Sequence, residues 1–234
     1  MFDKIKYRKL LDDCHAFNKK LAEEKWPEIK DEPIGFLYDG PIDIENWDSK
    51  KIKTLFVAQE HYGFWDCEPR EIYYEKNFGI TFHKRIAWFT GLLSKYFQDN
   101  SIFNEEELNQ LYYDNAFLEN SWNDSALIEV KKISGDDSSA DYHDIYDNGT
   151  KNKYYITEQI KMINPDIIFC CGKVIFDLYT QQLNVFPIDN YFYNYDQWCY
   201  FSGKKIVINS QHPSWRYFRR KHAYQCIVNE LRKK

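Results

Sequence analysis

Short apolar runs rich in β-branched residues alternate along the chain with longer segments of helical periodicity. Runs of this kind predict buried strands, and their alternation with helices predicts a parallel sheet covered on both faces. Four strands are expected, over Thr54–Ala58, Ser125–Val130, Asp166–Cys171 and the run that begins at Ile206. The pattern therefore indicates an α/β protein.

The helices are predicted from the spacing of apolar residues between these runs. They are expected over residues 3–24, Lys84–Phe97, Asn104–Leu118, Lys151–Ile163, Val174–Leu183, and from Trp215 or Tyr217 to Leu231. The Pro- and Gly-containing residues 26–49 and the acidic stretch Asp136–Asn148 are expected to be loops. We expect one domain over residues 1–234, with an N-terminal helix and loop in 1–49 and the α/β core in 50–234.

Net charge and aromatic content limit the possible binding partners but do not indicate a function. The 234 residues carry a formal net charge of −5, so binding to nucleic acid would need a local basic patch. Aromatic residues make up 18% of the chain. Most are expected in the core, but aromatic rings also stack on unpaired bases, so a minority could line a binding cleft.

The six cysteines show no C-x-x-C pair and no regular spacing. Reduced thiols in a cytoplasmic protein are therefore expected. No apolar run approaches the length of a membrane span, and neither a metal site nor a cofactor is predicted. We expect a monomer.

Polar residues follow two of the predicted strands at the points where the strands end. Gln59-Glu60-His61-Tyr62-Gly63 follows the first strand, and Gln211-His212-Pro213-Ser214 follows the last. A third motif, Gly79-Ile80-Thr81-Phe82-His83, precedes a predicted helix. Because the carboxyl ends of parallel strands meet at one edge of the sheet, these groups are expected to gather there.

This order of elements and motifs resembles the uracil-DNA glycosylase superfamily over roughly residues 50–232. The resemblance implies a three-layer α/β/α sandwich with a four-stranded parallel sheet. It also implies hydrolysis of the N-glycosidic bond of a base flipped out of DNA. Such chemistry needs a basic group near the sugar, a hydrogen-bond donor near the leaving base, and a pocket for that base.

The resemblance assigns roles to particular residues. Glu60 falls at the position that activates water, and His212 at the position that donates a hydrogen bond to the departing base. Phe82 matches the aromatic residue that stacks on the base. Gln59 and Tyr62 are expected in the base pocket, where some relatives use a tyrosine to exclude 5-substituted pyrimidines.

Glu129 departs from the pattern of uracil-specific relatives, which have an asparagine at the corresponding position. A carboxylate only accepts hydrogen bonds and would be repelled by O4 of uracil, whereas it can accept from the exocyclic amine of cytosine. Because excision of ordinary cytosine would destroy the host genome, the prediction is a modified cytosine. Tyr62 argues against a 5-substituted base, although His61 replaces the usual proline of its loop.

Contacts with DNA are expected on both sides of this pocket. The resemblance implies a wedge that enters the base stack, for which Trp215, Arg216 and Tyr217 are the candidates. Ser214, just before them, is also expected to contact DNA. Phosphates are expected to be held by Lys131, Lys132, Arg219 and Arg220.

The sequence thus predicts a monofunctional DNA glycosylase that removes hydroxymethylated or glucosylated cytosine from phage DNA as antiviral defence. An alternative is a repair glycosylase for uracil or another deaminated base. An alternative of a different class is a catalytically inactive nucleic-acid-binding module on the same fold. Hydrolysis of a free nucleotide or sugar nucleotide is a further possibility, against which the basic-aromatic run after His212 argues.

Overall fold

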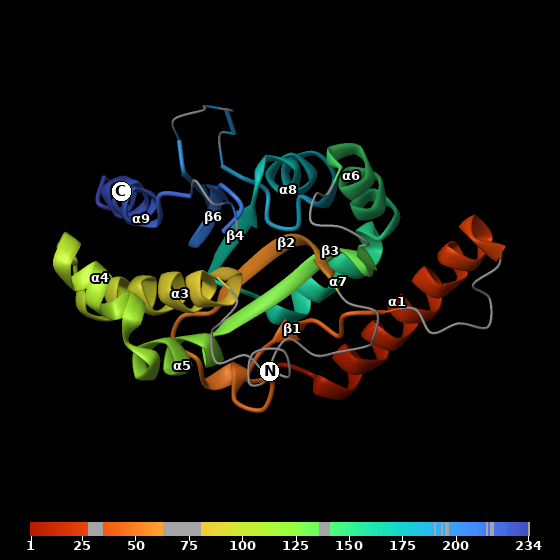
Figure 1. Ribbon diagram of the computed structural model, residues 1–234, viewed down its shortest axis with the longest axis horizontal. Helices are drawn as coiled ribbons and strands as arrows, with labels where there is room; N and C mark the ends of the chain where they lie inside the picture. The colour runs from red at the N-terminus through yellow and green to blue at the C-terminus, as the bar shows by residue number, and fades with distance from the viewer. Residues whose placement is uncertain are drawn as a thin grey trace.

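The computed structural model describes residues 1–27, 35–62, 81–135, 141–189, 191–192, 194, 197–213, 215 and 218–233 (Figure 1). The side chains of residues 60–62 and 133–135 lie outside this description. Among the helices described, none combines the length and the apolar character needed to cross a lipid bilayer.

The described strands form one six-stranded mixed sheet in the order β1-β3-β2-β4-β6-β5. Their bounds are β1 (Gly40–Pro41), β2 (Thr54–Tyr62), β3 (Ser125–Gly135), β4 (Ile167–Cys171), β5 (Cys199–Ser202) and β6 (Lys205–Ser210). The four predicted strands make the parallel centre, β3-β2-β4-β6. The prediction of four strands alone is wrong, because β1 and β5 add antiparallel edges.

The prediction missed the two edge strands for different reasons: β1 lacks an apolar pattern, and β5 is only a short apolar run, Cys199-Tyr200-Phe201. β1 consists of Gly40 and Pro41, two residues that normally interrupt strands, and Pro is tolerated at an edge because it need not donate to a neighbour. β5 forms a hairpin with β6, in which Ser202 pairs with Lys205. Gly203 in the turn has a φ of 57°, a left-handed conformation that glycine adopts without steric cost.

The predicted helices are present, with shifted bounds. They are α1 (Lys4–Lys25), α3 (Thr81–Asp99), α4 (Glu105–Tyr113), α5 (Asn115–Asn123), α7 (Lys153–Ile163), α8 (Lys173–Leu178) continued by a π-helical turn η3 (Tyr179–Leu183), and α9 (Arg220–Leu231). The single helix expected over Asn104–Leu118 is two helices. Asp114 divides them, because its side chain accepts a hydrogen bond from Phe117 N–H and caps α5.

Both segments expected to be loops, residues 26–49 and Asp136–Asn148, contain regular structure. The first contains β1 and a 3-10 turn, η2 (Trp47–Ser49). Much of the second belongs to helix α6 (Tyr142–Lys151), which the loop prediction missed. Asp141 caps this helix by accepting from His143 N–H at 2.7 Å. A capping residue can thus start a helix in a stretch whose composition suggested a loop.

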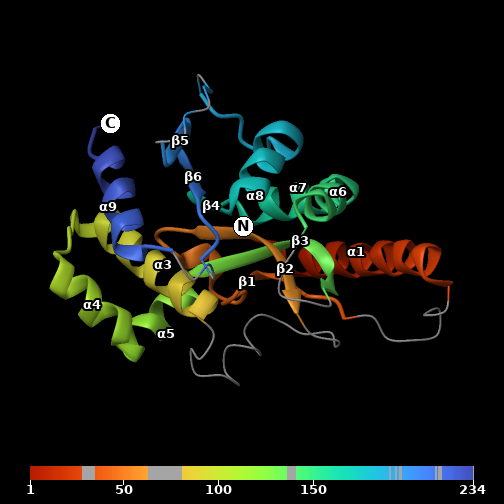
Figure 2. The ribbon, with the colours of Figure 1, turned by 45° about the horizontal axis from the view of Figure 1, so that its top comes forward.

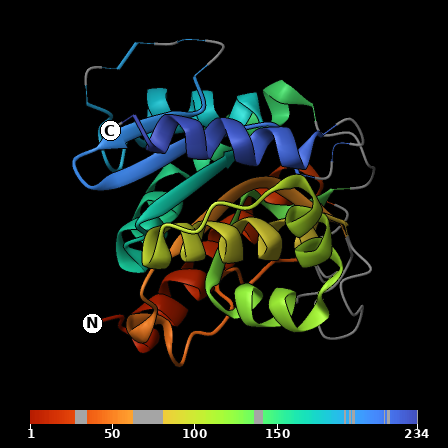
Figure 3. The ribbon, with the colours of Figure 1, turned by 90° about the vertical axis from the view of Figure 1, so that its left-hand side faces the viewer.

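Two hydrophobic clusters lie on opposite faces of the sheet. Alternate strand residues divide between them, as Phe56 and Ala58 belong to the first cluster and Leu55 and Val57 to the second. The first cluster packs against α3, α4, α5 and α9, and the second against α1, α6, α7 and α8. Figure 2 shows the sheet between these helices, and Figure 3 faces the layer with α3 in yellow and α9 in dark blue. Each large apolar side chain buried in this way contributes about 1.5–3 kcal/mol.

Candidate functional site

The strand order creates a switch point at the carboxyl edge of the sheet. β2 lies between β3 and β4, so the chain leaves β2 toward one side and later returns to its other side at β4. Adjacent parallel strands with this relation leave a crevice beyond their carboxyl ends, where ligands of open α/β sheets bind. Gln59 near the end of β2 and Gly172 just after β4 lie at this point.

Gly172 brings three segments of the chain together. Its φ of 107° is one that side-chain-bearing residues rarely adopt. A Cβ at this position would lie 3.0 Å from Nε2 of Gln59 and 3.9 Å from Cβ of His212. The ends of β2, β4 and β6 therefore converge within van der Waals distance, as the sequence predicted for Gln59 and His212.

His212 stacks on the ring of Phe82, which comes from the first turn of α3. The ring centroids are 5.2 Å apart and the planes differ by 5°. Burial lowers the pKa of His212 to about 4, so the imidazole is neutral at pH 7. A neutral imidazole carries one N–H donor and one acceptor, which suits a hydrogen bond to a polar group of a ligand.

Arg85 fixes the segment that follows His212, and the sequence analysis missed it. Its guanidinium donates hydrogen bonds to the carbonyl oxygens of Pro213 and Trp215, the second at 3.1 Å. The same guanidinium lies 5.4 Å from the ring centre of Phe218. Arg85 follows Phe82 by one helical turn, so one face of α3 supplies both the stacking ring and the clamp. That spacing was the only signal available in the sequence.

Glu129 lies buried in β3, with 3% of its surface exposed, opposite Ala58 of β2. The pKa of the Cys171 thiol is raised by burial first, and also by the charges of Cys170 and Glu129. Cys171 belongs to the same hydrophobic cluster against which Phe82 packs. The carboxylate predicted to bind the base edge is therefore on the face of the sheet that carries Phe82.

Several predicted site residues lie partly or wholly outside the described residues. Glu60 pairs through its backbone with Lys131 in the β2–β3 ladder, but its side chain and that of Tyr62 lie outside the described residues. Ser214 and two of the predicted wedge residues, Arg216 and Tyr217, also lie outside them. Trp215 is 48% exposed.

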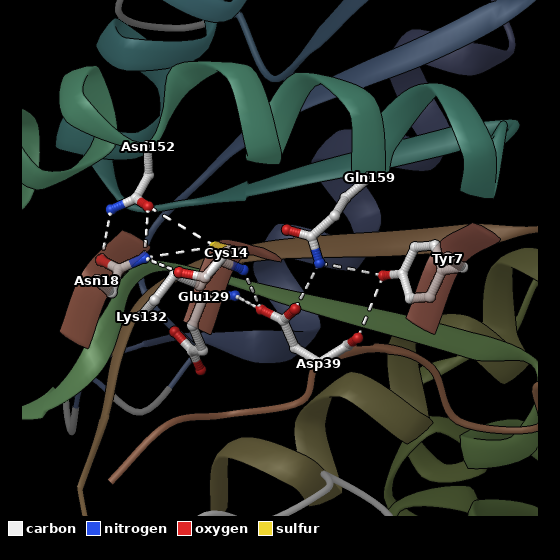
Figure 4. Close-up of polar contacts among 8 residues, drawn as sticks. All are labelled: Tyr7, Cys14, Asn18, Asp39, Glu129, Lys132, Asn152 and Gln159. Atoms are coloured by element: carbon white, nitrogen blue, oxygen red, sulfur yellow. Dashed lines mark hydrogen bonds and ion pairs between the residues drawn. The ribbon is translucent and has the colours of Figure 1, made fainter. Parts of the chain in front are cut away.

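Lys132 does not hold a phosphate, which corrects the sequence-based prediction. Its side chain is fully buried and pairs with Asp39 at 2.5 Å, on the opposite side of β3 from the Glu129 side chain (Figure 4). Strand alternation places Val130 and Lys132 together on the face covered by α1 and α7. Lys131 does not join this pair, and its Nζ lies 2.9 Å from Oδ2 of Asp144 in α6.

Asp39 anchors the carboxyl half of β3 through a buried hydrogen-bond network (Figure 4). Its Oδ2 atom accepts from Glu129 N–H at 2.7 Å as well as from Lys132, and Oδ1 accepts from Gln159 Nε2 at 2.6 Å. The Tyr7 hydroxyl donates to the Asp39 carbonyl oxygen. Sequence patterns gave no sign of this network, because its members are far apart along the chain.

The remaining basic residues lie near α9. Arg219 is exposed, and the guanidinium of Arg220 lies 3.8 Å from the ring centre of Tyr112. Within the described ranges, no three His, Cys, Asp or Glu side chains gather as a metal site would require. Comparison of the sequence with protein-family models and with curated proteins finds no match.

Proposed function

We propose that the protein is a DNA glycosylase with the three-layer architecture of the uracil-DNA glycosylase superfamily. The observation that carries the proposal is the parallel stack of a partly buried, neutral His212 on Phe82 at the switch point of the sheet. An aromatic face and a neutral donor at one position are what a flipped base and its leaving-group oxygen require.

In the proposed reaction, water attacks C1′ of the sugar and the bond from C1′ to the base nitrogen breaks. Glu60 takes a proton from the water, and the base departs with the bonding electron pair. The N–H of His212 donates a hydrogen bond to the oxygen of the departing base. The imidazole stays neutral at pH 7, so it donates without adding a cation to the pocket.

We propose a modified cytosine as the substrate, hydroxymethylated or glucosylated, in the DNA of an infecting phage. Glu129 supports this choice, because its buried carboxylate can accept a hydrogen bond from the cytosine amine. A base of this kind is foreign to the host, so its removal would damage the invading genome alone. The activity would act as antiviral defence.

The test is a base-release assay on three duplexes containing uracil, hydroxymethylcytosine or glucosylated hydroxymethylcytosine. The Glu60→Gln variant is expected to lose about 100-fold or more in rate, because it removes the general base. Glu119→Gln makes the same chemical change on the exposed surface of α5 and is expected to keep the wild-type rate.

The three duplexes distinguish the proposal from its alternatives. Release from the modified cytosines alone supports the proposed substrate. Release from uracil alone contradicts it and indicates a repair glycosylase. DNA binding without release from any duplex indicates a non-catalytic nucleic-acid-binding module.

A further inference from the structure

A cavity of about 350 Å³ lies beside the N-terminus of α9, next to the candidate site. Its walls include Glu105, Phe218, Arg219, Arg220, Lys221 and His222. Phe218 also underlies the Arg85 guanidinium that clamps the segment after His212. The cavity therefore borders the same loop that carries the proposed leaving-group donor.

The charges around this cavity are not balanced. Lys221 pairs with Glu105 at 2.7 Å, and this hydrogen bond lowers the pKa of the Glu105 carboxyl, which therefore stays ionised and engaged. In the described part of the chain, no carboxylate lies within ion-pair distance of Arg219 or Arg220. An excess of positive charge thus remains at this position of a protein whose net charge is −5.

Lys84 adds a further cation to the same cluster. Its Nζ lies 4.6 Å from the ring centre of Tyr112, and Cζ of Arg220 lies 3.8 Å from the same ring centre. Burial, and then the charge of Arg220, lower the pKa of Lys84. Two like charges held against one ring repel each other, and an anion bound to Arg220 would reduce that repulsion.

Two features of Arg220 and of helix α9 also favour binding of an anion. The Nε atom of Arg220 is buried and, among the described groups, has no hydrogen-bond partner. Arg219 precedes α9 as its N-cap without a side-chain cap hydrogen bond. The twelve-residue helix α9 adds its positive dipole end to the surrounding side chains.

We propose that this cavity binds a phosphate group. A backbone phosphate of the DNA strand held at the candidate site is the source we favour, an assignment that rests on the proposed function. The proposal extends the predicted role of Arg219 and Arg220 to a cavity whose wall includes both residues, with Lys84 beyond it on the Tyr112 ring that Arg220 contacts. A free phosphorylated small molecule would offer the same chemistry, and the experiment separates the two sources.

The experiment measures binding of the full-length protein to an undamaged single-stranded oligonucleotide as a function of salt concentration, and separately to inorganic phosphate. The Arg219→Gln/Arg220→Gln variant is expected to lower the salt slope of DNA binding by about 0.7, the value for the one phosphate that is no longer neutralised. Lys19→Gln/Lys20→Gln removes the same charge from α1 on the other face of the sheet and should leave the slope unchanged. The single variant Arg219→Gln changes an exposed residue that is not packed, so a reduction of the slope in this variant, up to about 0.7, does not depend on folding.

If the cavity variants lose DNA binding and the α1 variant does not, the result supports a backbone phosphate. Loss of phosphate binding with unchanged DNA binding supports a phosphate site but overturns the DNA source. Equal behaviour of the cavity and α1 variants in both assays overturns the proposal. Because this experiment does not measure base release, its result would stand even if the protein proved not to be a glycosylase.

Discussion

His212 follows β6, and its ring stacks on Phe82 while its Cβ lies near Gly172. Burial favours its uncharged form, and this preference links the residue to the stability of the whole protein. In the unfolded chain, a histidine takes up a proton near pH 6.5. The folded state resists protonation until about pH 4, so the two states differ in bound protons between these values.

The first prediction is that acid destabilises the protein through His212. As the pH falls from 6.5 to 4, only the unfolded state binds the proton, so the free energy of unfolding falls by about 3 kcal/mol. Above pH 6.5 this contribution is fully present. Urea unfolding at pH 7 and pH 4.5 should show a loss about 2–3 kcal/mol larger in the wild type than in His212→Asn. Equal losses would contradict the burial of a neutral imidazole.

The second prediction concerns the crowding at Gly172. Gly172→Ala places a Cβ 3.0 Å from Gln59 at a φ of 107° and should destabilise the protein by about 2–3 kcal/mol. Gly203→Ala also has a positive φ, but nothing lies within 4 Å of its Cβ, so about 1 kcal/mol is expected. The measurement is the urea midpoint of both variants. Equal effects would show that backbone strain, not convergence of the three strand ends, requires glycine at position 172.

Single residues differed in how far the sequence could locate them. His212 and Gln59 were predictable because each follows an apolar run, and Phe82 because it lies at the start of a clear helix. Arg85 was not, since its partners Pro213 and Trp215 come from a distant part of the chain. The prediction that Lys132 holds a phosphate was wrong, because lysine is buried where a buried carboxylate pairs with it.

The strand β3 is held by a buried ion pair between Lys132 and Asp39. Asp39 reaches it from the segment before β1, while Gln159 of α7 and Tyr7 of α1 complete the contacts. Loss of one partner would leave an uncompensated charge in a space that water does not reach. Because Asp39 Oδ2 also accepts from Glu129 N–H, loss of the pair would change the position of Glu129.

The third prediction is a double-mutant cycle on this pair. Lys132→Met and Asp39→Asn should each reduce the free energy of unfolding by about 3–5 kcal/mol. The double variant should cost clearly less than the two effects added, because neither charge is then left alone. Lys151→Met breaks an exposed pair with Asp147 and should cost less than about 1 kcal/mol. Strict additivity in guanidinium unfolding would mean that the ion pair contributes no coupling.

Element boundaries followed local chemistry more than hydrophobic pattern. Asp114 caps α5 and thereby splits a stretch whose periodicity alone predicted one helix. β1 carries no apolar signal and the apolar run of β5 is short, so both edge strands are specified by the neighbours with which they pair. Pairing of that kind becomes visible only when β3 and β6 are in place.

At the scale of the whole molecule, the sheet joins two hydrophobic clusters that share every central strand. α1 closes the second cluster with Tyr7 and Leu11, and its Asn18 exchanges hydrogen bonds with Asn152 at the start of α7. An N-terminal helix bound in this way belongs to the same folding unit as the sheet.

The fourth prediction is that deletion of residues 1–27 destroys cooperative unfolding. The apolar residues beneath α1 would become exposed, so the truncated chain should bind a hydrophobic dye and lack a sharp thermal transition. The full-length chain should instead unfold in one step by tryptophan fluorescence and far-UV circular dichroism. A truncated chain that keeps the same sharp transition would show that α1 is an appendage of an independent core.

Local pattern by itself determined the class of fold, the four central strands and most of the helices, because burial of an apolar face imposes a period on each segment. It also located the polar groups at the strand ends, since those positions follow from strand direction alone. Tertiary structure decided the edge strands, the Arg85 clamp, the burial of Lys132 and the cavity beside α9. Each of these depends on contacts between residues far apart in sequence, and only packing determines which of them meet.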